Sequence, residues 1–168
     1  MQRDCPHPSA DNRWDVTAID IGQEAPDFIL KNQNGEGITL SSFRGSKTIV
    51  LMFYPFAFSG ICTGELCELR DNLPDFTADD VEVLAVSCDP MFSLRAFADK
   101  EGFEFSLLSD FWPHGDIAKM YGVFNETVGA ASRGTYIIDP EGIVRWKVEN
   151  GLPDKRDINS YKKALGSL

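Results

Sequence analysis

A run of apolar residues that ends at a proline constrains the fold of this chain more than any other feature. The run Ile49 to Tyr54 suits a buried β-strand, and Pro55 follows it directly. Proline lacks a backbone N–H and has a fixed φ, so it removes a ladder hydrogen bond and ends a strand. An irregular turn rich in glycine and aromatic residues then leads to Cys62. We therefore predict that a buried strand delivers the chain to this cysteine.

A helical pattern begins near Cys62. Leu66, Leu69 and Leu73 recur at helical spacing, and charged residues fill much of the remaining helix surface. Backbone N–H groups in the first turn of a helix lack intrahelical partners, and the helix dipole places partial positive charge there. Both effects favour the thiolate, which is the nucleophilic form of cysteine. A buried structural cysteine is the alternative and the more common role of a single cysteine; the surrounding residues decide between the two.

The residues around Cys62 resemble the active-site motif of the peroxiredoxins, with a proline at Pro55, a hydroxyl residue at Ser59 and the reactive cysteine at Cys62. Three more segments resemble that family in the expected order: Gly22 to Phe28, LLSDFWPHGDIAKMYGVFNE from Leu107, and Arg133 to Asp139, which is similar to the strand that bears the family's active-site arginine. The resemblance extends from about Ile21 to Leu165. It is closest to the alkyl hydroperoxide reductase E subgroup, with a peroxiredoxin Q-like second cysteine.

Strand and helix patterns alternate along the rest of the chain. Strands are predicted at Phe28 to Leu30, Ile38 to Leu40, Thr48 to Tyr54, Val81 to Ser87, Phe105 to Leu108, Thr135 to Ile138 and Ile143 to Val148, and helices from Cys62 to near Pro74, Phe92 to Lys100, Ile117 to Tyr121 and Asp157 to Leu165. This order predicts an α/β fold whose mixed central sheet is covered by helices on both faces. The resemblance implies the peroxiredoxin variant of the thioredoxin-like fold.

Composition and charge limit the domain organisation and the partners. Residues 1–20 show no clear periodicity, so we expect a flexible N-terminal extension before a single domain of residues 21–168. A formal net charge of -10 disfavours nucleic acids and anionic membranes as partners, because both require a basic surface. The longest apolar run is too short to span a bilayer, and four unevenly spaced cysteines do not suggest a secreted disulfide framework. A cytoplasmic protein is predicted.

The resemblance implies a thiol-dependent peroxidase that reduces hydrogen peroxide and organic hydroperoxides, with peroxynitrite as a further candidate. Cys62 is the expected peroxidatic nucleophile. Ser59 would hold the thiolate and contact the peroxide, Arg133 would supply a fixed positive charge, and Pro55 would shield the sulfur and shape the turn. Without the resemblance, Ser59 would be interpreted as a turn or cap residue and Arg133 as half of a surface ion pair. Glu65 either orients Arg133 or is a capping or solvated carboxylate.

The thiol that resolves the resulting sulfenic acid is an open question. Cys67 lies five residues after Cys62, a spacing that peroxiredoxin Q-like proteins use for an intramolecular disulfide, whereas the E-type subgroup is regarded as one-cysteine. Five residues of continuous helix rise about 7.5 Å, and a disulfide needs backbone movement beyond a Cα separation of about 7 Å. The first turn would have to unwind, which Gly64 makes less costly.

Other thiols compete with Cys67 for this role. Cys67 is alternatively a small apolar residue packed beneath its helix, and Cys88 is a further candidate that is more typical of a core or strand-end residue. Without a resolving cysteine, an external reductant would be needed. Thioredoxin, a glutaredoxin-like protein and a low-molecular-weight thiol are the candidates.

Two other classes of protein share this fold. A general thiol–disulfide oxidoreductase normally carries two cysteines separated by two residues at the start of the helix, and this chain has no such pair. A noncatalytic binding or chaperone-like module would have no need of Ser59, Cys62 and Arg133 together. The peroxidase interpretation is therefore preferred.

No cofactor or metal is expected, and by analogy with the family we expect a homodimer. Cys5 and His7 are too few to form a metal site, and His114 is expected to be a loop residue. Six aromatic residues could surround the active site, form a subunit contact or pack in the core: Phe53, Tyr54, Phe56, Phe58, Phe111 and Trp112.

Overall fold

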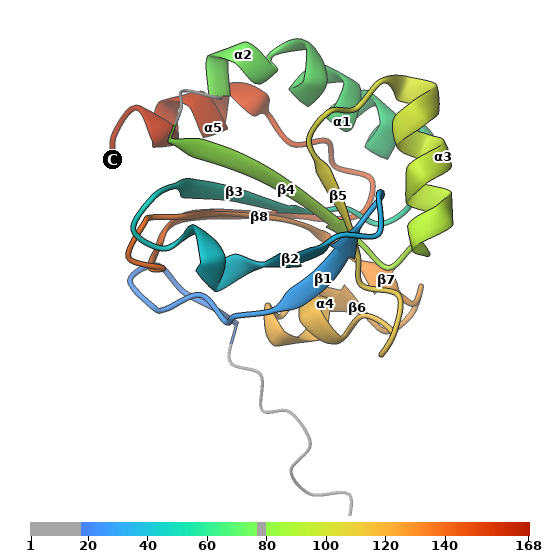
Figure 1. The fold of residues 1–168 in the computed structure, drawn as a ribbon, viewed down its shortest axis with the longest axis horizontal. Coiled ribbons are helices and arrows are strands. Elements are labelled where there is room, and N and C mark those ends of the chain that lie inside the picture. The colour runs from blue at the N-terminus through green and yellow to red at the C-terminus, as the bar shows by residue number, and fades with distance from the viewer. Residues whose placement is uncertain (1–17, 77–79) are drawn as a thin grey trace, which may run out of the picture.

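The computed structural model describes residues 18–76 and 80–168. A mixed seven-stranded sheet in the order β2-β1-β5-β4-β3-β8-β9 forms its centre (Figure 1). The strands are β1 (Ile29–Asn32), β2 (Gly37–Thr39), β3 (Thr48–Phe53), β4 (Val81–Ser87), β5 (Ser106–Ser109), β8 (Arg133–Ile138) and β9 (Val144–Asn150). The helices are α1 (Gly60–Asp71), α2 (Leu73–Phe76), α3 (Met91–Glu101), α4 (Asp116–Met120) and α5 (Ile158–Leu165), with a 3-10 turn, η1, at Leu40–Phe43.

Helices cover both faces of the sheet, as predicted. Helices α1, α3 and α5 lie over one face of the sheet, whereas α4 and η1 lie on the other (Figure 1). Their buried side chains form two separate cores. The interior strand β3 is apolar from Ile49 to Phe53 because its side chains enter both cores: Val50 and Met52 belong to the first core, and Leu51 and Phe53 to the second. This arrangement is the thioredoxin-like α/β fold.

The pairing of β3 with its neighbours determines where the end of β3 lies. β3 runs parallel to β4 and antiparallel to β8, with Met52 opposite Thr135. The carboxyl end of β3 and the first residue of β8, Arg133, therefore lie at the same end of the sheet. Because α1 follows β3 after a short turn, the start of α1 is brought to the same place.

Most predicted elements are found within a few residues of their expected bounds. The strand at Val81–Ser87 and the hairpin around Asp139 to Gly142 are confirmed. The pattern missed the small second sheet formed by β6 (Phe124–Asn125) and β7 (Ala130–Ala131), because two-residue strands are too short to show a periodicity. Of the predicted N-terminal extension, residues 1–17 lie outside the described residues. In the described part of the chain, no helix combines the length and hydropathy that crossing a membrane requires.

Candidate active site

Cys62 lies in the first turn of α1, where the helical pattern predicted it. Its side chain is fully buried. Ser59 is the N-cap residue with an extended backbone, φ -69° and ψ 147°, and its carbonyl accepts a hydrogen bond from the N–H of Thr63 at 2.8 Å. The Ser59 hydroxyl makes no capping hydrogen bond. Cys62 therefore lies at the end of α1 where the helix dipole and the unpaired first-turn N–H groups place partial positive charge.

The turn between β3 and α1 is held from the end of β4. Pro55 is buried and follows β3 after one residue, as expected of a strand terminator. The N–H of Ala57 donates to Asp89 Oδ2 at 2.8 Å, and the Ser87 hydroxyl donates to the same oxygen at 2.7 Å. Phe58 has a φ of 66°, which is rare for a bulky residue and costs of the order of 1–3 kcal/mol. These contacts over-determine the turn, so Ser59 and Cys62 have fixed positions.

Arg133 reaches the sulfur from the first position of β8. Its Nη2 donates to Cys62 Sγ at 3.4 Å, and its Nη1 donates to Glu65 Oε2 at 2.6 Å. Its Nε donates to the Leu152 carbonyl at 2.7 Å. The Arg133 side chain is 3% exposed, so it is not half of a surface ion pair. Three separate partners fix the guanidinium in one orientation.

Glu65 is the carboxylate that Arg133 contacts, and it is buried rather than solvated. It lies one turn after Cys62 on α1, and its side chain is 3% exposed. Both oxygens accept hydrogen bonds: Oε2 from Arg133 and from Arg156 Nη2 at 2.9 Å, and Oε1 from the Arg156 backbone N–H at 2.7 Å. This geometry is the one that the orienting interpretation of Glu65 requires.

Arg156, which the sequence pattern did not identify, completes the cluster. It precedes the N-cap residue of α5 and is 4% exposed. Besides Glu65, its Nη1 donates to the carbonyls of Phe53 at 2.6 Å and Gly134 at 3.0 Å, and to Thr135 Oγ1 at 3.1 Å. One guanidinium therefore connects α1, the end of β3 and the start of β8. It follows a lysine and precedes an aspartate, a pattern that is typical of a solvated surface segment.

Hydrogen bonds outweigh burial at Glu65. Burial by itself would raise the pKa of this carboxyl, but the hydrogen bonds and charge of Arg156, with the charge of Arg133, bring the pKa below its usual value of 4.5. The carboxylate is therefore the form that the folded protein stabilises. Two arginines and one carboxylate leave one positive charge in excess beside Cys62 Sγ.

The structure places the other cysteines away from this cluster. Cys67 is partly buried on the same helix, and its Sγ lies 3.6 Å from Glu101 Oε2 on α3. Cys88 is buried immediately after β4, where burial first and the neighbouring charge of Asp110 second raise the pKa of its thiol to about 12. Cys62, Cys67 and Cys88 are all free thiols. Cys5 lies outside the described residues.

The aromatic residues near the turn divide into two groups. Phe53 and Tyr54 are fully buried in the core, whereas Phe56 is 43%, Phe58 48%, Phe111 48% and Trp112 83% exposed. A single collar around Cys62 is therefore wrong, because the alternating faces of β3 direct Phe53 and Tyr54 to opposite cores.

His114 and its surroundings contain no metal centre. As a loop residue, His114 bonds through Nε2 to the Gly129 carbonyl at 2.7 Å and through Nδ1 to the Phe111 carbonyl at 3.2 Å. Across residues 18–76 and 80–168, no group of three or more His, Cys, Asp or Glu side chains could hold a metal ion. Cys5 and His7 lie outside that part.

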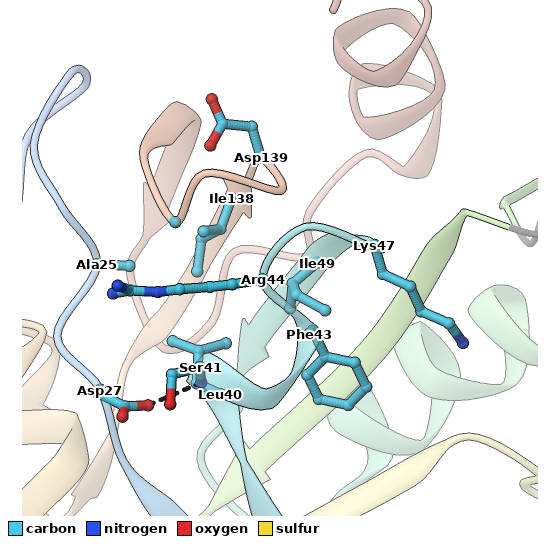
Figure 2. Close-up of a pocket in the computed structure, with 11 residues that line it drawn as sticks. Ala25, Asp27, Leu40, Ser41, Phe43, Arg44, Lys47, Ile49, Ile138 and Asp139 are labelled. Carbon is cyan, nitrogen blue, oxygen red and sulfur yellow. Dashed lines mark hydrogen bonds between the residues drawn. The ribbon is translucent and has the colours of Figure 1, made fainter.

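Cys62 lines neither of two hollows in the described surface. One, with a volume of about 10 Å³, is lined by Ile49 near the start of β3 and Ile138 at the end of β8, so it lies at the opposite end of the sheet. Figure 2 shows the Arg44 side chain extended across it and Asp27 bonded to Ser41. This space is about that of a single water. The other is a groove of about 440 Å³ beside the start of α3.

This chain is similar to known alkyl hydroperoxide reductases and peroxiredoxins. A model of the AhpC/TSA family matches residues 21–147. Alkyl hydroperoxide reductase E of Mycobacterium tuberculosis is 46% identical over 150 residues, 89% of this chain and 98% of that protein. Chloroplastic peroxiredoxin Q of Populus jackii is 36% identical over 151 residues, 89% of this chain and 70% of that protein. The crystal structure of peroxidoxin BcpB from M. tuberculosis matches with a TM-score of 0.77 and 30% identity, over 89% of this chain and 96% of that one.

Replacing Glu65 by glutamine is expected to destabilise the fold by about 3–5 kcal/mol, because two buried guanidinium groups lose their counter-charge. Since the pKa of Glu65 is lower in the folded protein, its contribution is present above the unfolded value of 4.5 and is lost as the pH falls through the folded value. The difference between wild type and Glu65→Gln in urea-unfolding free energy should therefore shrink below pH 4.5.

Glu68→Gln is the matched control for this prediction. Glu68 lies on the same helix, is 36% exposed and pairs with Lys155, so its loss should cost only about 0–1 kcal/mol. Equal effects of the two substitutions at pH 7 would contradict the account of the buried cluster.

Proposed function

The chain belongs to the AhpC/TSA family and is a thiol-dependent peroxidase, a peroxiredoxin of the alkyl hydroperoxide reductase E type, and on this premise we propose that Cys62 is its peroxidatic nucleophile. The observation that carries the proposal is the 3.4 Å contact between Arg133 Nη2 and Cys62 Sγ. The arginine belongs to a buried cluster with one more positive than negative charge. A thiolate at Cys62 makes that cluster neutral.

The proposed reaction uses these groups in one displacement. The Cys62 thiolate attacks one oxygen of a hydroperoxide, an S–O bond forms as the O–O bond breaks, and the departing oxygen takes up a proton to leave as water or an alcohol. Negative charge gathers on that oxygen in the transition state, and fixed donors stabilise it. We assign this role to Arg133 and to the Ser59 hydroxyl. That hydroxyl makes no capping hydrogen bond to the start of α1. Pro55, which is buried, shields the sulfur from water.

Glu65 and Arg156 serve the reaction through Arg133. Glu65 accepts from Arg133 at 2.6 Å and from two groups of Arg156. These bonds hold the guanidinium toward the sulfur before the peroxide arrives. Both are therefore positioning residues.

The product of the attack is a sulfenic acid on Cys62, and we assign its resolution to Cys67. Both cysteines belong to α1, both are free thiols, and Gly64 between them is exposed and weakens the helix. Cys88 is buried and its raised thiol pKa of about 12 makes it a poor nucleophile. The disulfide would be reduced by thioredoxin, a glutaredoxin-like protein or a low-molecular-weight thiol.

A second copy of the chain is the proposed partner of the aromatic surface around the start of α3. The groove of about 440 Å³ is lined by Ile29, Phe92, Phe111 and Trp112, which are 71%, 70%, 48% and 83% exposed. Exposed apolar surface of this kind marks interaction sites. Its position at the start of α3, directly after the Asp89 that holds the active turn, would connect the dimer contact to the active site.

The peroxidase proposal is tested by intact-mass analysis after one equivalent of hydrogen peroxide, with a sulfenic acid trap present and free thiols then blocked. Wild type should lose two hydrogens and two blockable thiols. Cys67→Ser should instead give a trapped adduct on Cys62, and Cys62→Ser should show neither change. Cys88→Ser is the control and should behave as wild type.

Either step of the proposal can fail separately in this experiment. A trapped adduct on Cys62 in wild type, with Cys67 still blockable, would assign resolution to an external thiol. Rapid peroxide-dependent oxidation that persists in Cys62→Ser would contradict the nucleophile assignment.

For the homodimer, sedimentation velocity should give wild-type particles of twice the 18.7 kDa chain mass. Trp112→Glu should shift them toward monomer, because a charge then enters the apolar contact. Leu168→Glu, at a residue that is 58% exposed and outside the groove, is the matched control. A monomeric wild type, or equal behaviour of both variants, would contradict this interface.

A further inference from the structure

The thiol of Cys67 faces away from the cluster that holds Cys62. Its Sγ lies 3.6 Å from Oε2 of Glu101, the last residue of α3, and the Glu101 side chain is only 19% exposed. Cys62, five residues earlier on the same helix, points instead to Arg133 on β8. The two thiols are therefore held by different parts of the fold.

Glu101 also holds α1 through its backbone. Its carbonyl is one of the acceptors that a helix end leaves without an intrahelical partner, because α3 ends there and Gly102 adopts a left-handed conformation with φ 70°. The Arg70 Nη1 donates to this carbonyl, and the Arg70 Nε donates to Asp71 Oδ1 at 2.8 Å. One residue of α3 thus binds both Cys67 and the final turn of α1.

Within residues 18–76 and 80–168, the charged groups that act on the Cys67 thiol lie on α1 and at the end of α3. On α1 these are Arg70 and Asp71; on α3, Glu101 faces the sulfur and Lys100 Nζ lies 3.7 Å from the other Glu101 oxygen. Burial raises the pKa of the Cys67 thiol most strongly, Arg70 opposes this, and Glu101 raises the pKa through both its charge and its hydrogen bond. The site therefore favours the protonated thiol.

We propose that Glu101 is a positioning residue that holds Cys67 against α3 as a thiol, and thereby sets the rate at which Cys67 reaches the sulfenic acid of Cys62. This inference rests on the proposed resolving role of Cys67. For resolution, the helix must unwind because five residues of helix separate the two Cα positions by about 7.5 Å of rise, and Cys67 must leave Glu101. The Cys67 proton is then lost to water.

The chemical step that follows is balanced within the chain. The Cys67 thiolate attacks the Cys62 sulfur, the S–S bond forms as the S–O bond breaks, and the hydroxide released takes up a proton to become water. Glu101 would slow this step by holding Cys67 against α3 as a thiol, so that Cys67 is released only with the unwinding of α1. The Glu101 carboxylate would therefore keep Cys67 away from Cys62 until α1 unwinds.

The test compares wild type with Glu101→Gln by rapid quenching after one equivalent of hydrogen peroxide, with sulfenic acid and disulfide separated by mass. Glutamine keeps the size of the side chain but removes its charge. The disulfide-forming step should accelerate relative to sulfenic acid formation in the same sample, by about threefold for each unit by which the pKa of the attacking thiol falls. The pH profile of that step should shift to lower pH, a change that loosened packing alone would not produce.

Two variants serve as controls. Glu101→Asp keeps the charge and should stay close to wild type. Glu68→Gln removes a carboxylate next to Cys67 in sequence that pairs with Lys155, and it should leave the pH profile unchanged.

The outcomes separate this inference from the proposal on which it rests. A Cys62–Cys67 disulfide that forms at the same rate or more slowly in Glu101→Gln overturns the role of Glu101 and leaves Cys67 as the resolving residue. A wild-type protein that accumulates sulfenic acid on Cys62 without any disulfide to Cys67 overturns both.

Discussion

The buried carboxylate of Glu65, between the guanidinium groups of Arg133 and Arg156, is the interaction on which the rest of the site depends. All three side chains are 3% exposed or less, so each charge is stabilised by its neighbours rather than by water. Pairs of this kind rarely add much net stability, but removing one partner is costly because the other charge stays buried. Here the cluster also binds together α1, β3, β8 and the segment before α5. These contacts hold the elements together at this end of the sheet. They also hold Arg133 against Cys62 Sγ.

One helix carries two thiols that contact different parts of the fold. The first turn of α1 presents Cys62 to the arginine cluster, while Cys67 is held against the end of α3. Peroxide attack needs a rigid, charge-compensated sulfur, whereas disulfide formation needs the helix to unwind. On the proposed function, dividing the contacts between β8 and α3 would keep the first turn of α1 rigid during peroxide attack and release Cys67 only when the helix unwinds.

Local patterns in the sequence predicted most of the fold and part of the site. The apolar run that ends at Pro55 and the leucines after Cys62 specify a strand, a turn and a helix through short-range preferences, and the structure has them there. Arg156 could not be predicted, because in sequence it stands in a charged segment before a helix and its burial arises only when α5 packs on the sheet. Burial also decides between the alternatives for Glu65, and it divides the aromatic residues into core and surface. These are tertiary effects with no local signal.

The most direct test of the central claim is the second-order rate constant for oxidation of Cys62 by hydrogen peroxide in Glu65→Gln. It should be measured by stopped flow at a temperature where far-UV circular dichroism shows the variant to be folded, with Glu68→Gln as the control. Glu65 accepts hydrogen bonds from Arg133 and Arg156 rather than from the sulfur, so a loss of rate would act through these two arginines. We predict a fall of about 100-fold, the scale expected when a reacting group is displaced by about 1 Å. A rate constant equal to that of wild type in the folded variant would contradict the claim that this cluster sets up the reaction.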